Sequence, residues 1–288
     1  MKTLVFIILA LSLVATAHAA STINTTNRYA YGANIGWMDW RGDNGTNGAV
    51  IGEYVCSGYL YAANVGWINL GSGVPADGIQ YQNTSATDFG VNQDGLGNLR
   101  GYAYGANVGW INFEDTGAPR VDLMTGNLSG HAYSANCGWI SLSNVFAFVQ
   151  TDTIAKGEDT DGDSIADAWE LTYTNTLSAF TATSDTDNDG QSDLEEYLAG
   201  TNPLDANDNL CITAFGAQPG GTTATVTWKS VLSRYYYLQN VLDLNSTAWT
   251  DSGLDLISPD GSTTTRSVSD TNAPMRFYRV QAVRPLAP

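Results

Sequence analysis

Residues 102–113 read YAYGANVGWINF, and three further copies of this string occur in the chain. The other copies are YAYGANIGWMDW from Tyr29, YLYAANVGWINL from Tyr59 and HAYSANCGWISL from His131. Self-similarity of this kind is typical of repeat architectures. We therefore expect an array of four related units, forming one domain over residues 20–150.

Each copy has the pattern of a β-hairpin. Residues 101–104 and 110–113 alternate in character, and the connection 105–109 is rich in glycine and small residues. A further short strand is expected before each hairpin. The spacing between copies two and three is longer because of an insertion around residues 71–86. The pattern predicts a mainly β fold that begins with an antiparallel β repeat domain.

The tryptophan of each copy is a candidate ligand-binding residue. Because side chains alternate along a strand, Trp110 shares a face with Asn112, while Ile111 and Phe113 share the core face. One interpretation is sugar recognition, in which the ring stacks on a pyranose and the polar neighbour binds hydroxyl groups. The other buries the rings between hairpins, as repeat units need buried contacts, and the sequence favours this second interpretation. The candidates are Trp37, Trp67, Asn69, Trp110, Asn112 and Trp139.

These strings resemble the AYSxNxGWISF-like repeats found in exported proteins of several bacterial groups. The resemblance covers residues 28–142 and implies an exported all-β module, with no activity attached to it.

Acidic residues are concentrated in one stretch of the chain. The whole sequence has a net charge of -17, and residues 151–208 hold 15 acidic residues against one basic residue, Lys156. A chain without a basic surface cannot neutralise nucleic-acid phosphates or anionic lipids. Nucleic acid is therefore not expected as a partner.

The string DTDNDGQSDLEE, from Asp185 to Glu196, fits the EF-hand loop pattern D-x-[DN]-x-[DN]-G-x5-E at every fixed position. An all-oxygen ligand set selects a hard cation, and this spacing indicates calcium. The expected ligands are Asp185, Asp187, Asp189, the carbonyl group of Gln191, Asp193 and Glu196.

A second string, DTDGDSIADAWE from Asp159 to Glu170, has the same spacing with Ser164 where the turn glycine belongs. We expect this loop to bind calcium more weakly, because that position needs unusual backbone angles. Its expected ligands are Asp159, Asp161, Asp163, the carbonyl group of Ile165, Asp167 and Glu170.

A short helix is expected after each loop, over ADAWELTYT and SDLEEYLAG, the latter ending at Gly200. These units, with the tail EYLAGTNPLDAND, resemble the thrombospondin type 3 and dockerin-like calcium repeats of exported bacterial proteins over residues 157–208. Because crowded carboxylates repel one another without a metal, we expect calcium to stabilise this segment as a stiff, calcium-loaded joint between two β domains. A cohesin partner is not expected, since dockerin repeats commonly end with Asp where both loops here end with Glu.

Residues 209–288 are rich in alternating Thr, Val and Tyr separated by turn residues, which predicts a C-terminal β-sandwich of about six strands. This region resembles C-terminal domains of exported planctomycete and verrucomicrobial proteins.

Residues 1–19 have the charged start, apolar run and Ala-His-Ala end of a secretory signal peptide. We expect secretion or display on the extracellular surface of a bacterium, with no membrane span after signal removal. The three cysteines, Cys56, Cys137 and Cys211, are too few to predict a disulfide framework.

Taken together, these features predict a secreted or cell-surface calcium-binding structural or adhesion protein without catalytic activity. Its partner would be a cell-surface or matrix glycan or protein. One alternative is a carbohydrate-binding module that uses the repeat aromatic residues. A less favoured one is a glycan-cleaving enzyme, for which Asp39, Glu53, Asp77 and Asp122 are available carboxylates. The single histidine after the signal peptide, His131, replaces a repeat tyrosine and is expected to be a packing variant.

Overall fold

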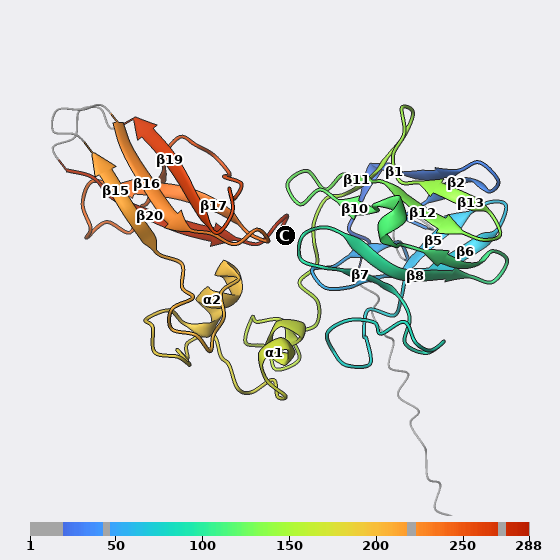
Figure 1. Ribbon diagram of the computed structural model, residues 1–288, viewed down its shortest axis with the longest axis horizontal. Helices are drawn as coiled ribbons and strands as arrows, with labels where there is room; N and C mark the ends of the chain where they lie inside the picture. Colours follow the sequence, from blue (N-terminus) through green and yellow to red (C-terminus); the bar gives the residue numbers. More distant parts are fainter. Residues whose placement is uncertain (1–19, 43–46, 218–222, 270–274, 288) are drawn as a thin grey trace, which may run out of the picture.

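The computed structural model describes residues 20–42, 47–217, 223–269 and 275–287. The expected signal peptide lies outside these described residues. Strands make up 40% of the chain and helices 6%, so the predicted mainly β, antiparallel fold is confirmed. Figure 1 shows a β domain built from the repeats, a β domain at the C-terminal end and a segment with both helices between them.

The four repeats form four hairpins that close into a ring. Consecutive hairpins pair side by side, and the first strand returns to the last through the pairs Tyr31 with Ser141 and Gly32 with Ile140. The sheet is therefore a closed barrel without a free edge at this seam. Its strands are β1 (Ile23–Gly32), β2 (Gly36–Asp39), β5 (Tyr59–Ala62), β6 (Gly66–Asn69), β8 (Leu99–Gly105), β9 (Gly109–Asn112), β12 (His131–Ser134) and β13 (Gly138–Ser141).

The asparagine of each repeat links its hairpin to the preceding one through a side-chain hydrogen bond. Asn64 donates a hydrogen bond from its side-chain amide to the carbonyl oxygen of Ile35, in the turn of the preceding hairpin, at 3.1 Å. The same bond recurs at each boundary, and Asn34 closes the circle by donating to Cys137 of the last hairpin at 3.1 Å. The two remaining bonds run from Asn107 to Val65 and from Asn136 to Val108.

Side chains inside the barrel are those that the alternation places on the core face. Met38, Leu60, Ile68, Ile111 and Ile140 are all buried. The neighbouring tryptophans point outward instead. The interpretation that buries these rings between hairpins is wrong, because the pleat directs them away from the core and they remain 42–48% exposed.

Short elements decorate the barrel. They are β3 (Val50–Ile51), β4 (Cys56–Ser57), β7 (Val91–Gln93), the 3-10 helix η1 (Asp115–Gly117), β10 (Arg120–Val121), β11 (Leu128–Ser129) and β14 (Val149–Thr151). Of these, β7 extends the sheet beside β8, and β14 pairs with β1. Strands outside the hairpins are thus present, as the sequence predicts.

Two three-stranded antiparallel sheets form the C-terminal domain. Trp228 of one sheet and Tyr236 of the other are fully buried in a shared core, with ring centroids 5.9 Å apart. The sheets contain β15 (Ile212–Ala217), β16 (Thr223–Lys229) and β19 (Thr263–Ser269), and β17 (Tyr235–Val241), β18 (Thr250–Asp251) and β20 (Phe277–Val283). This packing is that of a small sandwich.

Within the described part of the chain, no helix is long and apolar enough to span a membrane. Cys56, Cys137 and Cys211 are free thiols, and the first two are buried.

Candidate metal centre

The two acidic loops each bring three carboxylates together. Ligand oxygens of Asp185, Asp187 and Asp189 lie within 4.8 Å of one another, and Asp159, Asp161 and Asp163 form an equivalent group. As predicted, helices follow directly: α1 (Asp167–Tyr173) after the first loop and α2 (Asp193–Ala199) after the second. Each loop and helix therefore form one continuous unit.

Backbone amides hold the second loop in a tight turn around its carboxylates. The amide of Gly190 donates to one oxygen of Asp185 at 3.0 Å, and the amide of Asp189 donates to the other at 3.1 Å. Gln191 donates its amide to Asp189 at 2.8 Å. These bonds satisfy some of the carboxylate oxygens and leave the others to face one another.

Several of the remaining carboxylate oxygens are buried without a hydrogen-bond partner. Glu170 and Glu196, at the last loop positions, are fully buried. Burial, followed by the charges of neighbouring aspartates, raises the pKa of each of these two carboxyls to about 8. Among the described residues, buried carboxylate oxygens without a hydrogen bond occur in Asp163, Glu170, Asp187, Asp189 and Glu196. A hard cation satisfies such oxygens, so the residues present fit a calcium ion.

Asp167 and Asp193 are placed differently from the other expected ligands. The oxygens of Asp193 accept hydrogen bonds from the amides of Thr186 and Thr181, at 3.1 and 3.2 Å. Asp167 similarly accepts from the amide of Thr160 at 2.8 Å. Neither side chain belongs to the three-carboxylate groups. Both side chains stabilise the start of their loop by accepting hydrogen bonds from backbone amides, and neither joins the three-carboxylate group.

The two loops differ in ways that favour the second. Ser164 has a φ of 84°, the left-handed conformation that Gly190 adopts without a side chain at 98°. Lys156 also lies in an ion pair with Asp159, its Nζ 2.7 Å from a carboxylate oxygen that a metal would use. The sequence indicated the first difference, but not the second.

Helix α2 is also better terminated than α1. Ser192 and Glu195 form a capping box at its start, and Gly200 ends it in the left-handed conformation. Ala166, at the start of α1, provides no side-chain cap.

An aromatic core joins the two loop-helix units. The ring centroid of Trp169 from α1 lies 5.6 Å from that of Tyr197 in α2 and 5.4 Å from that of Phe180. Ile165, an expected carbonyl ligand, buries its side chain in the same core, and Tyr54 of the repeat domain packs against it. The acidic segment is therefore attached to the barrel through apolar contacts.

A buried ion-pair network joins all three parts of the chain. Glu53 of the repeat domain lies 3.0 Å from Arg234 and 2.7 Å from Arg284, both of the sandwich. Tyr197, the residue after Glu196, donates its hydroxyl to Glu53 at 3.3 Å. Arg234 also donates to the carbonyl oxygens of Tyr197 and Leu198, at 2.9 and 3.0 Å, and so caps the end of α2. Sequence reasoning missed this junction, since nothing local to Glu53 marks it.

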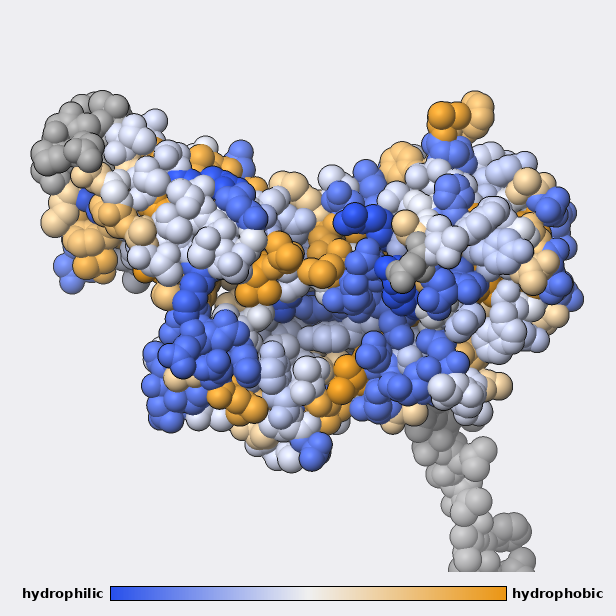
Figure 2. Space-filling model, viewed as in Figure 1, coloured by the Kyte–Doolittle hydropathy of each residue, from blue (hydrophilic) through white to orange (hydrophobic). Residues whose placement is uncertain are grey.

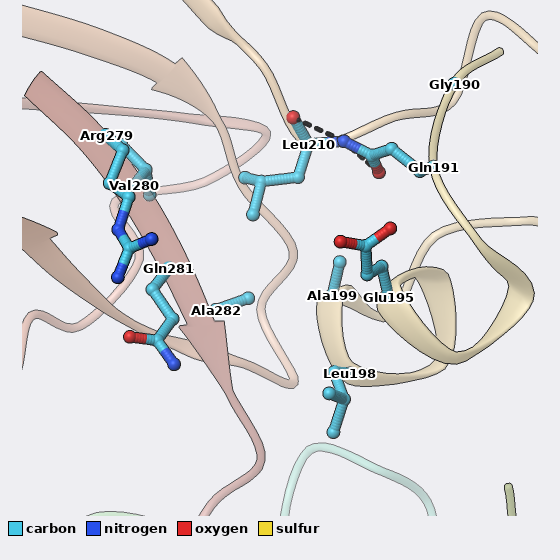
Figure 3. Close-up of a pocket in the computed structure, with 10 residues that line it drawn as sticks. All are labelled: Gly190, Gln191, Glu195, Leu198, Ala199, Leu210, Arg279, Val280, Gln281 and Ala282. Atoms are coloured by element: carbon cyan, nitrogen blue, oxygen red, sulfur yellow. Dashed lines mark hydrogen bonds between the residues drawn. The ribbon is translucent and has the colours of Figure 1, made fainter. Parts of the chain in front are cut away.

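The acidic segment also meets the sandwich across a cavity of about 490 Å³ between α2 and β20. Figure 3 shows Gln191 reaching across to Leu210 at the start of the sandwich. Its side-chain amide donates to the Leu210 carbonyl oxygen at 2.8 Å. Gln191, expected to offer only its backbone carbonyl, thus also ties its loop to the next domain.

The carboxylates considered for glycan cleavage have other partners. Besides Glu53 in its network, Asp39 pairs with Arg28 at 3.1 Å. Asp122 accepts hydrogen bonds from the backbone amides of Met124 and Thr125. Asp77 accepts hydrogen bonds from the backbone amides of Ile79 and Gln80. His131 lies edge-on to Trp139, with ring centroids 6.2 Å apart. Each of these four carboxylates, and His131, therefore makes a contact within the fold.

The outward tryptophans each pair with a tyrosine of the same hairpin. Tyr104 and Trp110, for example, have ring centroids 4.9 Å apart, and the corresponding distances in the other hairpins are 4.9–5.0 Å. Asn69 uses its side-chain oxygen to accept a bond from the amide of Gly71. The side-chain oxygen of Asn112 is buried without a partner. The barrel therefore carries four aromatic pairs on its outer surface, which we call the aromatic belt (Tyr31, Trp37, Tyr61, Trp67, Tyr104, Trp110, Tyr133 and Trp139).

The fold and the loops define a mainly β protein of several parts, with two acidic loops able to hold a hard cation. Residues 185–206 match the family model of the bacterial TSP3 repeat. That repeat is a calcium-binding structural family typical of extracellular proteins. The match covers the second loop, α2 and the tail after it. No curated protein and no solved structure matches the chain.

Proposed function

We propose that this chain is an exported, non-catalytic protein in which calcium fixes the arrangement of two β domains. The observation that carries this proposal is the position of Tyr197. It directly follows Glu196, an expected calcium ligand, and its hydroxyl and carbonyl groups contact Glu53 and Arg234. Calcium bound in the second loop would therefore order the helix that holds the repeat domain and the sandwich together.

Electrostatics supports a calcium requirement. Residues 151–208 carry 15 of the 29 acidic side chains of the whole chain. Clustered carboxylates repel one another when no cation is bound, and extracellular calcium modules typically bind with dissociation constants of about 10⁻⁴–10⁻³ M. Free calcium then stabilises the folded chain by mass action.

A calorimetric calcium titration of the chain without residues 1–19 tests the proposal. We expect about two sites, as the two loops imply, with the site in the second loop lost when Asp185 and Glu196 are replaced in Asp185→Ala/Glu196→Gln. Glu158→Gln is the matched control, because Glu158 is exposed in the same acidic segment but outside both ligand sets. Absence of binding heat and of a calcium-dependent thermal shift in the unmodified chain would contradict the proposal.

A second candidate function is glycan binding by the aromatic belt, which would make the chain an adhesion module. The observation that favours it is exposure: the four belt tryptophans are 42–48% exposed although they lie on the hydrogen-bonded sheet of the barrel. Clustered exposed aromatic rings mark interaction surfaces. The partner would be a cell-surface or matrix glycan, and a protein partner on the same surface is the competing candidate.

A further inference from the structure

The insertion between the second and third repeats leads into a segment, residues 83–89, that lies beside one belt tryptophan. We call this segment the wall. Tyr81 anchors it: its ring is buried, and its hydroxyl donates to the carbonyl oxygen of Cys56 at 3.1 Å. From there, residues 83–89 run past the outer face of the third hairpin and end with Phe89 against Trp110, their ring centroids 5.1 Å apart.

Hydrogen bonds keep this wall in place. The two carboxylate oxygens of Asp88 accept bonds from the amides of Ala76 and Gln82, both at 3.1 Å. Asn83 accepts from the amide of Gly90 at 3.0 Å, and its own backbone amide donates to the Asp88 carbonyl oxygen at 3.1 Å. The wall is thus preorganised, which lowers the entropic cost of binding a ligand against it.

Trp110 is held in one orientation by its neighbours. Phe89 and Tyr102 meet it edge-on at 85° and 76°, and Tyr104 packs on it at 59°. Even so, 45% of Trp110 stays exposed. A rigid ring with a free surface is the usual platform for stacking a sugar ring.

Between the wall and this ring lies a cavity of about 410 Å³. Its volume falls in the range of small-molecule sites, about 300–1,000 Å³. The lining combines aromatic rings with hydroxyl and amide groups and contains no charged side chain. It consists of Asn83, Thr84, Ser85, Ala86, Phe89, Tyr102 and Trp110.

The geometry points to a binding subsite for a neutral hexopyranose at Trp110, formed by the insertion and the third hairpin. This inference rests on the second candidate function above and narrows it to one of the four aromatic pairs. A sugar ring offers apolar C–H groups to the indole and hydroxyls to the side chains of Thr84 and Ser85. An anionic sugar is disfavoured, because the lining supplies no cation and the chain has a net charge of -17.

The test uses the full chain without residues 1–19, in millimolar calcium, with a panel of neutral hexasaccharides as probes. The panel contains β-1,4-glucan, β-1,3-glucan, β-1,4-mannan and β-1,4-linked N-acetylglucosamine oligomers. Binding is followed by calorimetry and tryptophan fluorescence. We expect at least one oligomer to bind, and Trp110→Ala to weaken its affinity by about tenfold or more.

Two further variants distinguish binding at this cavity from binding elsewhere on the belt. Ala86→Trp leaves Trp110 intact and fills the cavity from an exposed position, so it should weaken binding as Trp110→Ala does. Trp37→Ala removes an equally exposed belt ring, 47% against 45%, outside this cavity and should change affinity by less than about twofold.

The inference is overturned if no oligomer binds to the unmodified chain. It is also overturned if Trp37→Ala weakens binding as much as Trp110→Ala. That result would still agree with glycan binding by the whole aromatic belt. Calcium titration of each variant, expected to match that of the unmodified chain, keeps this outcome separate from the calcium proposal.

Discussion

Glu53 and Arg284 stand 231 positions apart and form a buried ion pair with 2.7 Å between carboxylate oxygen and guanidinium nitrogen. Arg234 occupies the other carboxylate oxygen, and the ring of Tyr197 lies under the Arg284 guanidinium at 5.4 Å. One carboxylate from the repeat domain therefore forms ion pairs with two arginines of the sandwich, next to the acidic segment. In Figure 2 the repeat domain, the acidic segment and the sandwich form one continuous surface. Hydrophilic and apolar residues are both present along the middle of the visible face.

Replacing this carboxylate should destabilise the whole arrangement. In Glu53→Gln both arginines remain buried without a counter-charge, and breaking a buried pair typically costs about 3–5 kcal/mol. Urea denaturation monitored by intrinsic fluorescence measures the loss. Glu114→Gln, an exposed carboxylate on the same domain, is the control. A loss no greater than that of the control would show that the network is not needed for stability.

Calcium removal should loosen the joint without unfolding the barrel. Chelation leaves the buried carboxylates of the second loop without a cation, so α2 and the contacts of Tyr197 lose their support. Small-angle scattering should then show a larger radius of gyration, and limited proteolysis should cut within residues 156–208. Circular dichroism should retain the β signal of the barrel and sandwich. An unchanged radius of gyration after chelation would argue against a calcium-dependent joint.

The two loops should respond oppositely to exchanging their turn residues. Ser164→Gly relieves a left-handed serine and should strengthen calcium binding at the first loop, by about 1 kcal/mol of binding free energy. Gly190→Ser introduces the same strain in the second loop and should weaken its binding by a similar amount. Calorimetry on both variants measures the two changes. If Ser164→Gly leaves the weaker site unchanged, the ion pair of Lys156 with Asp159 limits its affinity instead, and Lys156→Met tests this.

The ring of asparagine side chains should contribute equally at each hairpin boundary. Asn107→Ala removes a bond to Val65 and Asn34→Ala removes the closing bond to Cys137, both 3.1 Å long. Each should cost about 1 kcal/mol of unfolding free energy. The control is Asn175→Ala, at an exposed position outside the barrel. Equal losses at Asn34 and Asn107 are expected, whereas no loss at Asn34 would mean that the seam between first and last hairpins is open.

Local pattern was enough to predict the hairpins, the two helices and the three-carboxylate groups. Each of these features depends on residues within about a dozen positions, such as Asp185 to Asp189, whose spacing brings them together when the loop turns. The left-handed conformation expected at the position of Ser164 follows in the same way from one loop. The failure of the burial interpretation for the tryptophans has a different origin. Alternation showed that they face away from Ile111 and its equivalents, but not that this outer face lies uncovered.

What the sequence by itself determined is therefore the repeat hairpins, the acidic loops with their helices and the mainly β character of the chain. Only the tertiary structure decided that Asn34 reaches Cys137 to close the barrel and that the wall lies against Trp110. The ion pairs of Glu53 with Arg234 and Arg284 likewise appear only in the folded chain. These contacts join residues far apart in the chain. Their partners carry no short-range signal, because the free energy of such contacts depends on burial and geometry that exist only once the parts have packed.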